Sequence, residues 1–224
     1  GGVEAMESAE LAYLRYQADR LLVSEAWYEI PLGRRNVGIK LIGVLQHEQR
    51  LPLLLQVIAD RTLSGWLQRF FGGDFRHGGI VRRNAVQYGI RMLRACDAET
   101  REVLLRALAA DPYFEVRSWA AQALGEQFAS DDGIERGLFA ALDDRSPDVV
   151  IQALAALGKV GRSADLLQRL RLFYLHPNWQ FRHGVILALI EFLRRGVLQP
   201  AQLQDDLDRV LASAPYFKPE FPLN

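Results

Sequence analysis

The sequence predicts an all-α fold: a right-handed α-α superhelix, or solenoid, of about five helical hairpin repeats followed by one further helix. Two observations carry this prediction. One short segment is written four times along the chain, and apolar residues recur within each copy at the spacing of one face of an α-helix. Half of the 224 residues are hydrophobic, which is enough for a sizeable core, and we expect one repeat domain over residues 1–224.

The copies of the repeated segment begin at equivalent points. They are Ile80–Ala85, Glu115–Ala120, Asp148–Ala153 and Gln180–Val185, with a weaker fifth copy near Arg34. We call the large residue at the second position of each of these four copies its anchor; the anchors are Val81, Val116, Val149 and Phe181, with Arg34 in the weaker copy. They are separated by 47, 35, 33 and 32 residues, and the last three separations are typical of one helical hairpin each.

Each copy of the segment is predicted to form the second helix of a hairpin. The anchor and the residues 4, 7, 8 and 11 positions after it are mostly apolar or small, which places them on one buried face of a helix. Another helical pattern precedes the anchor, and Pro112, Pro147 or Pro177 separates the two helices. We expect helices over residues 4–24, 32–46, 49–60, 80–95, 98–110, 115–128, 132–142, 147–160, 163–174, 179–194 and 200–212.

The residues around the third and fourth anchors resemble the HEAT-repeat family, including the HEAT-like repeats of phycobilin lyases, within the wider armadillo-type superhelix. The resemblance is carried by Asp111–Arg117 followed by Ala120–Gly125, and by Asp144–Gly158 in the next copy. It covers roughly residues 30–212 and is strongest in the middle. Such motifs imply the architecture well and the function poorly.

The same resemblance implies a ladder of charges along the solenoid, made of an Asp in each turn and an Arg directly after each anchor. The matching residues of this chain are Asp111, Asp144, Arg82, Arg117 and Arg182. Val150 stands at an Arg position and His176 at an Asp position, so we expect the ladder to be broken there.

The separation of 47 residues between the first two anchors indicates an insertion of about a dozen residues, at about 64–79. Five glycines surround an aromatic cluster there, which predicts a short extra helix and a mobile loop. The candidate residues are Trp66, Phe70, Phe71, Asp74, Phe75 and Arg76. They either fill a gap between repeats or dock a partner.

Candidate partner-binding residues lie opposite the buried stripe of each second helix, at positions 2, 3, 6 and 10 after the anchor. In HEAT-like solenoids this face lines the concave surface. The candidates are Arg83, Asn84, Gln87, Arg91, Trp119, Gln122, Glu126, Gln152, Lys159, His183 and Glu191. A tryptophan among arginines and amides is typical of a protein-binding surface, so we expect a scaffold that holds a partner protein. Trp119 lies at the edge of this face, where it either anchors the partner or packs into the next repeat.

Charge and cysteine content exclude several classes of partner. Lys plus Arg equals Asp plus Glu at 27 each, so the chain has no global basic field that would collect nucleic acid or anionic membrane. Its single cysteine, Cys96, cannot form an intramolecular disulfide and fits a reducing compartment, so we expect a cytoplasmic protein. No apolar run approaches the roughly 20 residues needed to span a bilayer. The abrupt ending around Pro219–Pro222 fits a piece of a longer protein.

Catalytic functions receive less support from the residues. The histidines, His47, His77, His176 and His183, share no zinc-like spacing, and no nucleophile–base set can be assembled from the sequence. We therefore expect no metal and no cofactor. The first alternative is a DNA-binding role like that of the HEAT-like alkylpurine DNA glycosylases, because Trp119, Arg83 and Arg91 imitate part of their aromatic and basic surface. A role like that of the bilin lyases comes third and depends on resemblance of fold alone.

Overall fold

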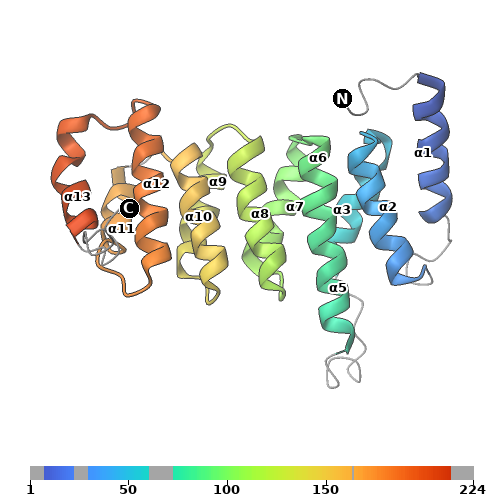
Figure 1. Cartoon of the computed structure of the whole chain (residues 1–224), viewed down its shortest axis with the longest axis horizontal. Coiled ribbons are helices and arrows are strands. Elements are labelled where there is room, and N and C mark those ends of the chain that lie inside the picture. The colour runs from blue at the N-terminus through green and yellow to red at the C-terminus, as the bar shows by residue number, and fades with distance from the viewer. Residues whose placement is uncertain (1–7, 23–29, 61–72, 163, 213–224) are drawn as a thin grey trace, which may run out of the picture. The chain divides into compact units, whose positions relative to one another are not determined.

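The computed structural model describes residues 8–22, 30–60, 73–162 and 164–212, which contain helices and turns and no strand (Figure 1). The chain divides into two compact units, residues 1–123 and 124–224, and each is described by itself. The predicted all-α repeat fold is confirmed. The right-handed superhelix and the single domain stay predictions.

The helices follow one another in pairs. The first unit contains α1 (Ser8–Leu22), α2 (Leu32–Val44), the 3-10 helix η3 (Glu48–Arg50), α3 (Leu51–Ala59), α5 (Gly73–Asn84), the π-helical segment η4 (Ala85–Ile90), α6 (Arg91–Leu93), α7 (Ala98–Ala110) and most of α8 (Phe114–Gln127). The second unit contains α9 (Asp132–Ala140), the 3-10 helix η5 (Ala141–Asp143), α10 (Pro147–Val160), α11 (Ala164–Arg171), α12 (Trp179–Arg194) and α13 (Pro200–Ala212). These bounds agree with the predicted helices except at the insertion.

The apolar stripe predicted for the second helices is buried. The buried anchors are Val81, Val116, Val149 and Phe181. In α10, the residues 4, 7, 8 and 11 positions after its anchor are buried as well; they are Ala153, Ala156, Leu157 and Val160. The weaker copy near Arg34 also forms a helix, α2, but Arg34 is exposed and the burial falls on Ile39 and Ile42.

One second helix departs from this spacing because it contains the π-helical segment η4. A π segment accommodates one extra residue within a helix. The spacing of the other copies predicts burial of Tyr88 and Met92, but both are half-buried, and Ile90 and Leu93 are buried instead. The prediction was wrong for these positions because it assumed an uninterrupted α-helix. The trace of the extra residue in the sequence is the anchor separation of 35, against 33 and 32 in the next repeats.

Three of the described turns within hairpins are each closed by one side chain. Asp111 and Asp144 accept a hydrogen bond from the backbone N–H two residues later, at 2.9 Å and 2.8 Å. His176 occupies the equivalent position, and its Nδ1 accepts from Asn178 N at 3.0 Å. The imidazole therefore replaces the carboxylate as the acceptor that closes the turn.

The predicted ladder is present between the second and third copies. Arg82 Nε and Nη2 donate to the two carboxylate oxygens of Asp111 at 2.8 Å and 3.0 Å, and both side chains are buried. Such a two-point ion pair fixes the turn of one repeat against the helix of another. By the same register, residue 150 would pair with residue 176. Because these residues are Val150 and His176, this step of the ladder contains neither the arginine nor the aspartate. A valine in place of arginine leaves no buried guanidinium that would need a carboxylate there.

Neighbouring second helices approach each other so closely that glycine is required at the contact. A Cβ on Gly43 of α2 would lie 1.7 Å from Tyr88 O, and a Cβ on Gly158 of α10 would lie 2.8 Å from Ala188 Cα of α12. Both glycines follow their anchors by nine residues. No real side-chain atom tolerates such distances, so these positions set how closely the helices pack.

The second half of the predicted insertion is helical. Because α5 begins at Gly73, the predictions of a loop extending to Gly79 and of a helix beginning at residue 80 were wrong. A Cβ on Gly79 would meet the Tyr113 ring at 2.6 Å, so this glycine admits an aromatic side chain against the helix. Packing of this kind outweighs the low helix propensity of glycine. Asp74, Phe75 and Arg76 lie in α5, whereas Trp66, Phe70 and Phe71 lie outside the described residues.

We predict that Asp111→Ala lowers the free energy of unfolding by about 3–5 kcal/mol, because it leaves the Arg82 guanidinium buried without its carboxylate. The control is Asp143→Ala, which removes an ion pair with Arg169 in which the Asp143 side chain is 73% exposed. This change should cost less than about 1 kcal/mol. Urea denaturation of both variants measures the difference, and equal losses would contradict the structural role of the ladder.

We predict opposite effects for two glycine substitutions in the same helix. Gly43→Ala inserts a methyl group against Tyr88 O and should destabilise the protein by at least about 1–3 kcal/mol. Gly33→Ala meets nothing within 4 Å and should be neutral or stabilise by up to about 1 kcal/mol, because alanine is the better helix former. Thermal unfolding of the two variants checks the prediction, which fails if Gly43→Ala is tolerated as well as Gly33→Ala.

Candidate functional site

The predicted partner-binding residues of the first unit lie on the continuous helix formed by α5, η4 and α6 and on the first part of α8, and the second helix α2 packs beside the first of these (Figure 1). We call the side of these helices that carries the candidates the first-unit surface. Contacts between side chains of successive helices fall into two groups, one polar and one made of cations over aromatic rings.

The polar group forms a continuous row of hydrogen bonds. Asn84 Nδ2 donates to Asn36 Oδ1 at 2.9 Å, and Arg83 Nη2 donates to Asn84 Oδ1 at 3.0 Å. Arg83 Nη1 then donates to Glu115 Oε2 at 2.6 Å, and Tyr113 OH donates to Glu115 Oε1 at 2.8 Å. Asn84 is buried, and its amide is consumed within the row. The charge of Arg83 is balanced by Glu115, so this row connects the helices rather than offering a free cation.

The second group consists of two cations stacked on aromatic rings. The Arg91 guanidinium carbon lies 4.9 Å from the centroid of the Trp119 ring, and Lys40 Nζ lies 4.8 Å from the centroid of the Tyr88 ring. Both distances are within the range of a cation–π contact. Trp119 and Tyr88 are half-buried, so each ring packs against its own surroundings and keeps part of its surface accessible. Trp119 therefore has features of a partner anchor and of a packing residue, the two roles that the sequence left open.

The π-helical segment determines which residues reach this surface. Once its extra residue is counted, Tyr88 rather than Gln87 stands at the sixth position after the anchor Val81, equivalent to Gln122 of α8. Gln87 is half-buried and enters none of the contacts of the two groups. Arg91 takes the position at which α2 and α10 carry the close-contact glycines. Between this helix and α8, the stack of Arg91 on Trp119 therefore lies where α2 and α10 have a close glycine contact with their neighbour.

The candidates of the second unit are not brought together in one cluster. Lys159 of α10 lies 3.7 Å from Glu126 of α8, and Glu191 of α12 pairs with Arg194 of the same helix at 3.0 Å. Gln152 is half-buried. His183 is exposed, and its ring lies 6.3 Å from that of Trp179. These contacts are local and define no common recess.

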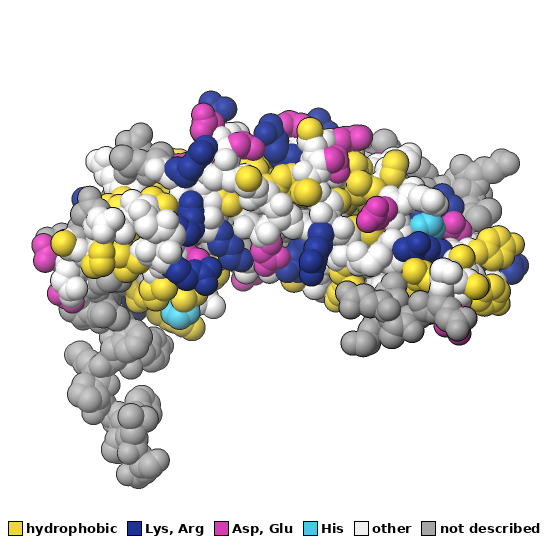
Figure 2. Space-filling model, turned by 90° about the horizontal axis from the view of Figure 1, so that it is seen from above, with side chains coloured by type: hydrophobic (Ala, Val, Ile, Leu, Met, Phe, Trp, Pro, Cys, Tyr) yellow, Lys and Arg dark blue, Asp and Glu magenta, His cyan; other side chains and the backbone are white. Residues whose placement is uncertain are grey.

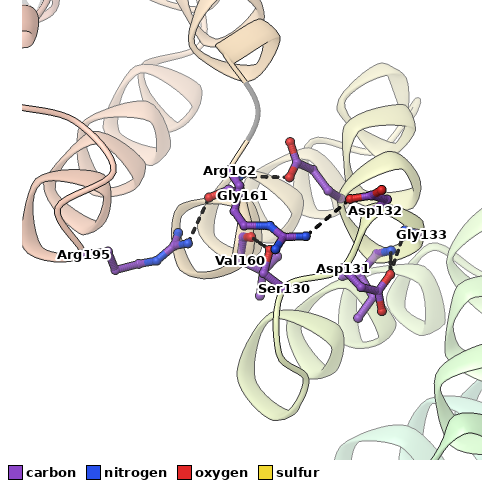
Figure 3. Close-up of polar contacts among 10 residues, drawn as sticks. Ser130, Asp131, Asp132, Gly133, Val160, Gly161, Arg162 and Arg195 are labelled. Atoms are coloured by element: carbon purple, nitrogen blue, oxygen red, sulfur yellow. Dashed lines mark hydrogen bonds and ion pairs between the residues drawn. The ribbon is translucent and has the colours of Figure 1, made fainter.

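Other polar side chains of the second unit close the end of α10 (Figure 3). Arg195 donates to Gly158 O at 2.8 Å and to Gly161 O at 3.0 Å, and Ser130 Oγ donates to Val160 O. Cations are favourable at a helix C-terminus, where carbonyl groups lack partners within the helix. Burial lowers the pKa of Arg195 from its ordinary value, which reflects its enclosed position. These side chains stabilise the repeat by pairing with backbone carbonyl groups. The first-unit surface is therefore the better candidate for the functional site.

Among the described residues of the first unit, His47 and Asp19 form a histidine–carboxylate pair with the geometry of a packing contact. His47 Nε2 and Arg50 Nε both lie against Asp19 Oδ1, at 3.0 Å and 2.7 Å, and His47 is buried. Burial alone would raise the pKa of Asp19, but the hydrogen bonds from Arg50 and His47 outweigh it and hold that pKa below its ordinary value. The carboxylate thus remains charged and ties α1 to η3.

Within the described ranges, no group of three or more His, Cys, Asp or Glu side chains is arranged to hold a metal ion. The expectation of no metal and no cofactor for the whole chain stays a prediction. None of the described helices is both long enough and apolar enough to cross a membrane. On the face drawn in Figure 2, basic and acidic side chains of the described residues are interspersed with apolar ones.

Several residues of the first-unit surface escaped sequence analysis. Lys40 and Asn36 belong to the weakest copy of the repeat, and Tyr88 is displaced by the π-helical segment. Glu115 directly precedes its anchor, outside the positions that periodicity selects. The anchor separation of 35 residues is the signal that could have identified Tyr88.

Comparison with known proteins agrees with this repeat structure. Residues 101–190 match the family model described as HEAT repeats. No curated protein and no solved structure matches the chain. The matched range covers the hairpins from α7 through most of α12, where the buried stripe and the turn-closing side chains recur. Residues 101–190 of the chain therefore form HEAT repeats.

Proposed function

We propose that this protein is a non-enzymatic scaffold that holds a partner protein on the first-unit surface. HEAT repeats are generally protein-interaction scaffolds. The observation that carries the specific proposal is the pair of cation–aromatic stacks, Arg91 on Trp119 and Lys40 on Tyr88, on successive helices of one unit. We further propose a cytoplasmic location, because the exposed thiol of Cys96 fits a reducing compartment.

The chemistry of these stacks suits an anchor site for a protein. Tryptophan, tyrosine and arginine are the residue types that most often dominate binding energy at protein interfaces. Stacking holds each ring and each cation in place before a partner arrives, which reduces the side-chain entropy lost on binding. Exposed apolar side chains of α2, Val37 and Val44, flank the same surface and would add buried area. A partner segment that carries apolar side chains beside a carboxylate would satisfy both features.

The polar row supports the first-unit surface structurally. Its charges are paired within the row, so they do not bind the partner directly. Arg83 is engaged by Glu115, and the amides of Asn84 and Asn36 are joined to each other. Fixed polar contacts between helices hold α2, α5 and α8 at a defined separation. The stacked rings can then present a constant shape to the partner.

We predict that Trp119→Ala and Tyr88→Ala each weaken partner binding by roughly 2 kcal/mol or more, which corresponds to about 30-fold in Kd. Because Trp119 is half-buried, its truncation should cost less stability than the roughly 3–5 kcal/mol typical of a core aromatic. Partners captured from the native organism are identified by mass spectrometry, and their affinities for the variants are then titrated.

The matched control for these variants is Tyr16→Ala, since Tyr16 is an exposed aromatic on α1 outside the surface. It should retain every partner. A strongly lowered melting temperature of Trp119→Ala with unchanged affinity of the folded protein would remove Trp119 from the site. Loss of binding in Tyr16→Ala as large as in Tyr88→Ala would contradict the location that we propose.

We predict that the protein binds duplex DNA weakly or not at all at physiological salt, because its charges are balanced and Arg83 is neutralised by Glu115. Titration of a labelled duplex at two salt concentrations checks this. Submicromolar affinity with a steep dependence on salt would favour the alternative of a DNA-binding HEAT-like protein over the protein scaffold.

A further inference from the structure

One face of α2 is exposed along the whole helix. It consists of Gly33, Val37, Lys40 and Val44, which follow one another at spacings of 4, 3 and 4 residues. At 3.6 residues per turn, these spacings keep the four positions within an arc of about 60° around the helix axis. In η4, in α6 and in residues 114–123 of α8, by contrast, every side chain is buried or half-buried. We call these four residues the α2 face.

The α2 face places a positive charge between two apolar side chains. Val37 is 50% exposed and Val44 is 46% exposed, and the exposed Lys40 lies between them on the same stripe. The helix as a whole contains three basic residues, Arg34, Arg35 and Lys40, and no acidic residue. A ligand of this face therefore needs apolar surface to cover the valines and negative charge to match the lysine.

Lys40 differs from the paired basic residues of the other second helices. Arg83 meets Glu115 at 2.6 Å, and Lys159 of α10 lies 3.7 Å from Glu126. Among the described residues, no carboxylate forms an ion pair with Lys40, whose Nζ lies 4.8 Å from the centroid of the Tyr88 ring. A ring covers one side of an ammonium group without neutralising it, so N–H donors remain for a carboxylate on the other side.

A helix is the protein element that matches the spacing of the α2 face. Two helices that pack nearly parallel present side chains to each other at spacings of 3 and 4 residues, as Val37, Lys40 and Val44 do. A Cβ on Gly33 would meet nothing within 4 Å, so this end of the face has room for a larger side chain of the ligand. A nucleic-acid backbone could bind Lys40, but its phosphates and sugars would leave the two valines without an apolar partner.

We propose that the α2 face binds an amphipathic, acidic α-helix of the partner protein. Apolar side chains of that helix cover Val37 and Val44, and a glutamate or aspartate between them accepts hydrogen bonds from Lys40 Nζ on the side away from the Tyr88 ring. This inference rests on the proposed scaffold function and adds the class of partner that the scaffold holds. It also connects the helix to the first-unit surface, because the lysine that it binds is the one stacked on Tyr88.

A displayed library of helical peptides tests this proposal on the full chain. Three positions at spacings of 3 and 4 residues are each varied among leucine, glutamate, glutamine and lysine on an alanine-rich helix, and binders are selected. We expect enrichment of glutamate at the central position between two leucines. Selection on the Lys40→Glu variant should instead enrich lysine at that position. Absence of glutamate enrichment, or the same enriched peptides on Lys40→Glu, would overturn the proposal.

Titration of the enriched peptide gives the size of the effect. Lys40→Gln should weaken its binding about tenfold, because one charge pair is lost. The matched control is Lys159→Gln, which changes an exposed lysine of α10 and should leave the affinity unchanged. Equal affinities for Lys40→Gln and the unmodified protein would contradict the proposal. Tighter binding of a labelled single-stranded RNA than of the peptide, weakened by Lys40→Gln, would also contradict it, because the α2 face would then serve nucleic acid.

The partner captured for the scaffold test separates this inference from the function on which it rests. If that partner loses affinity in Trp119→Ala but not in Lys40→Gln, the acidic helix is overturned and the scaffold function stands. If the selected peptide depends on Lys40 while no captured protein depends on Trp119 or Tyr88, the α2 face is supported and binding through the two stacks is contradicted.

Discussion

The close approach of neighbouring second helices is the contact on which the other features of each unit depend. Gly43 and Gly158 allow one helix backbone to lie against the next, at distances that no side chain could occupy. With the helices this close, the stripe of Val149 and its equivalents is enclosed, and the turns are brought within reach of the neighbouring helix. At the helix pair where Gly79 admits the Tyr113 ring, Arg82 meets Asp111 with both carboxylate oxygens, which fixes the turn without leaving a buried charge unpaired.

The proposed binding surface arises where this pattern is interrupted. The π-helical segment rotates the remainder of its helix by one residue, so Arg91 takes the glycine position and Tyr88 turns toward the surface. The Arg91–Trp119 stack then fills the space that a glycine contact would close. π-helical segments are frequent at functional sites, because they change which side chains share a face without breaking the helix. The π-helical segment and the two cation–aromatic stacks thus involve the same helix of the first unit.

Local sequence signals were sufficient for most of the fold, and contacts between helices explain what they missed. Periodicity identified the stripe of α10, and Pro112 and Asp111 marked a turn whose hydrogen bond is observed. Tyr88 was missed because one extra residue changes the register without changing the composition of the helix. The start of α5 was placed too late because Gly79 weakens the helical pattern, while its benefit comes from the Tyr113 ring, which is distant in sequence. Periodicity selected Arg83 and Trp119 as surface candidates, but their contacts with Glu115 and Arg91 became apparent only from the packing.

The most direct test of the scaffold function is photo-crosslinking from the proposed surface. A photoreactive phenylalanine derivative at position 88 in place of Tyr88, and another at position 16 in place of Tyr16, are irradiated in cells of the native organism. We expect position 88 to yield a discrete crosslink to one partner protein, and this crosslink should be lost when Trp119→Ala is added. Position 16 should not yield it. A crosslink that forms equally from both positions, or that persists in the Trp119→Ala background, would contradict binding through the first-unit surface.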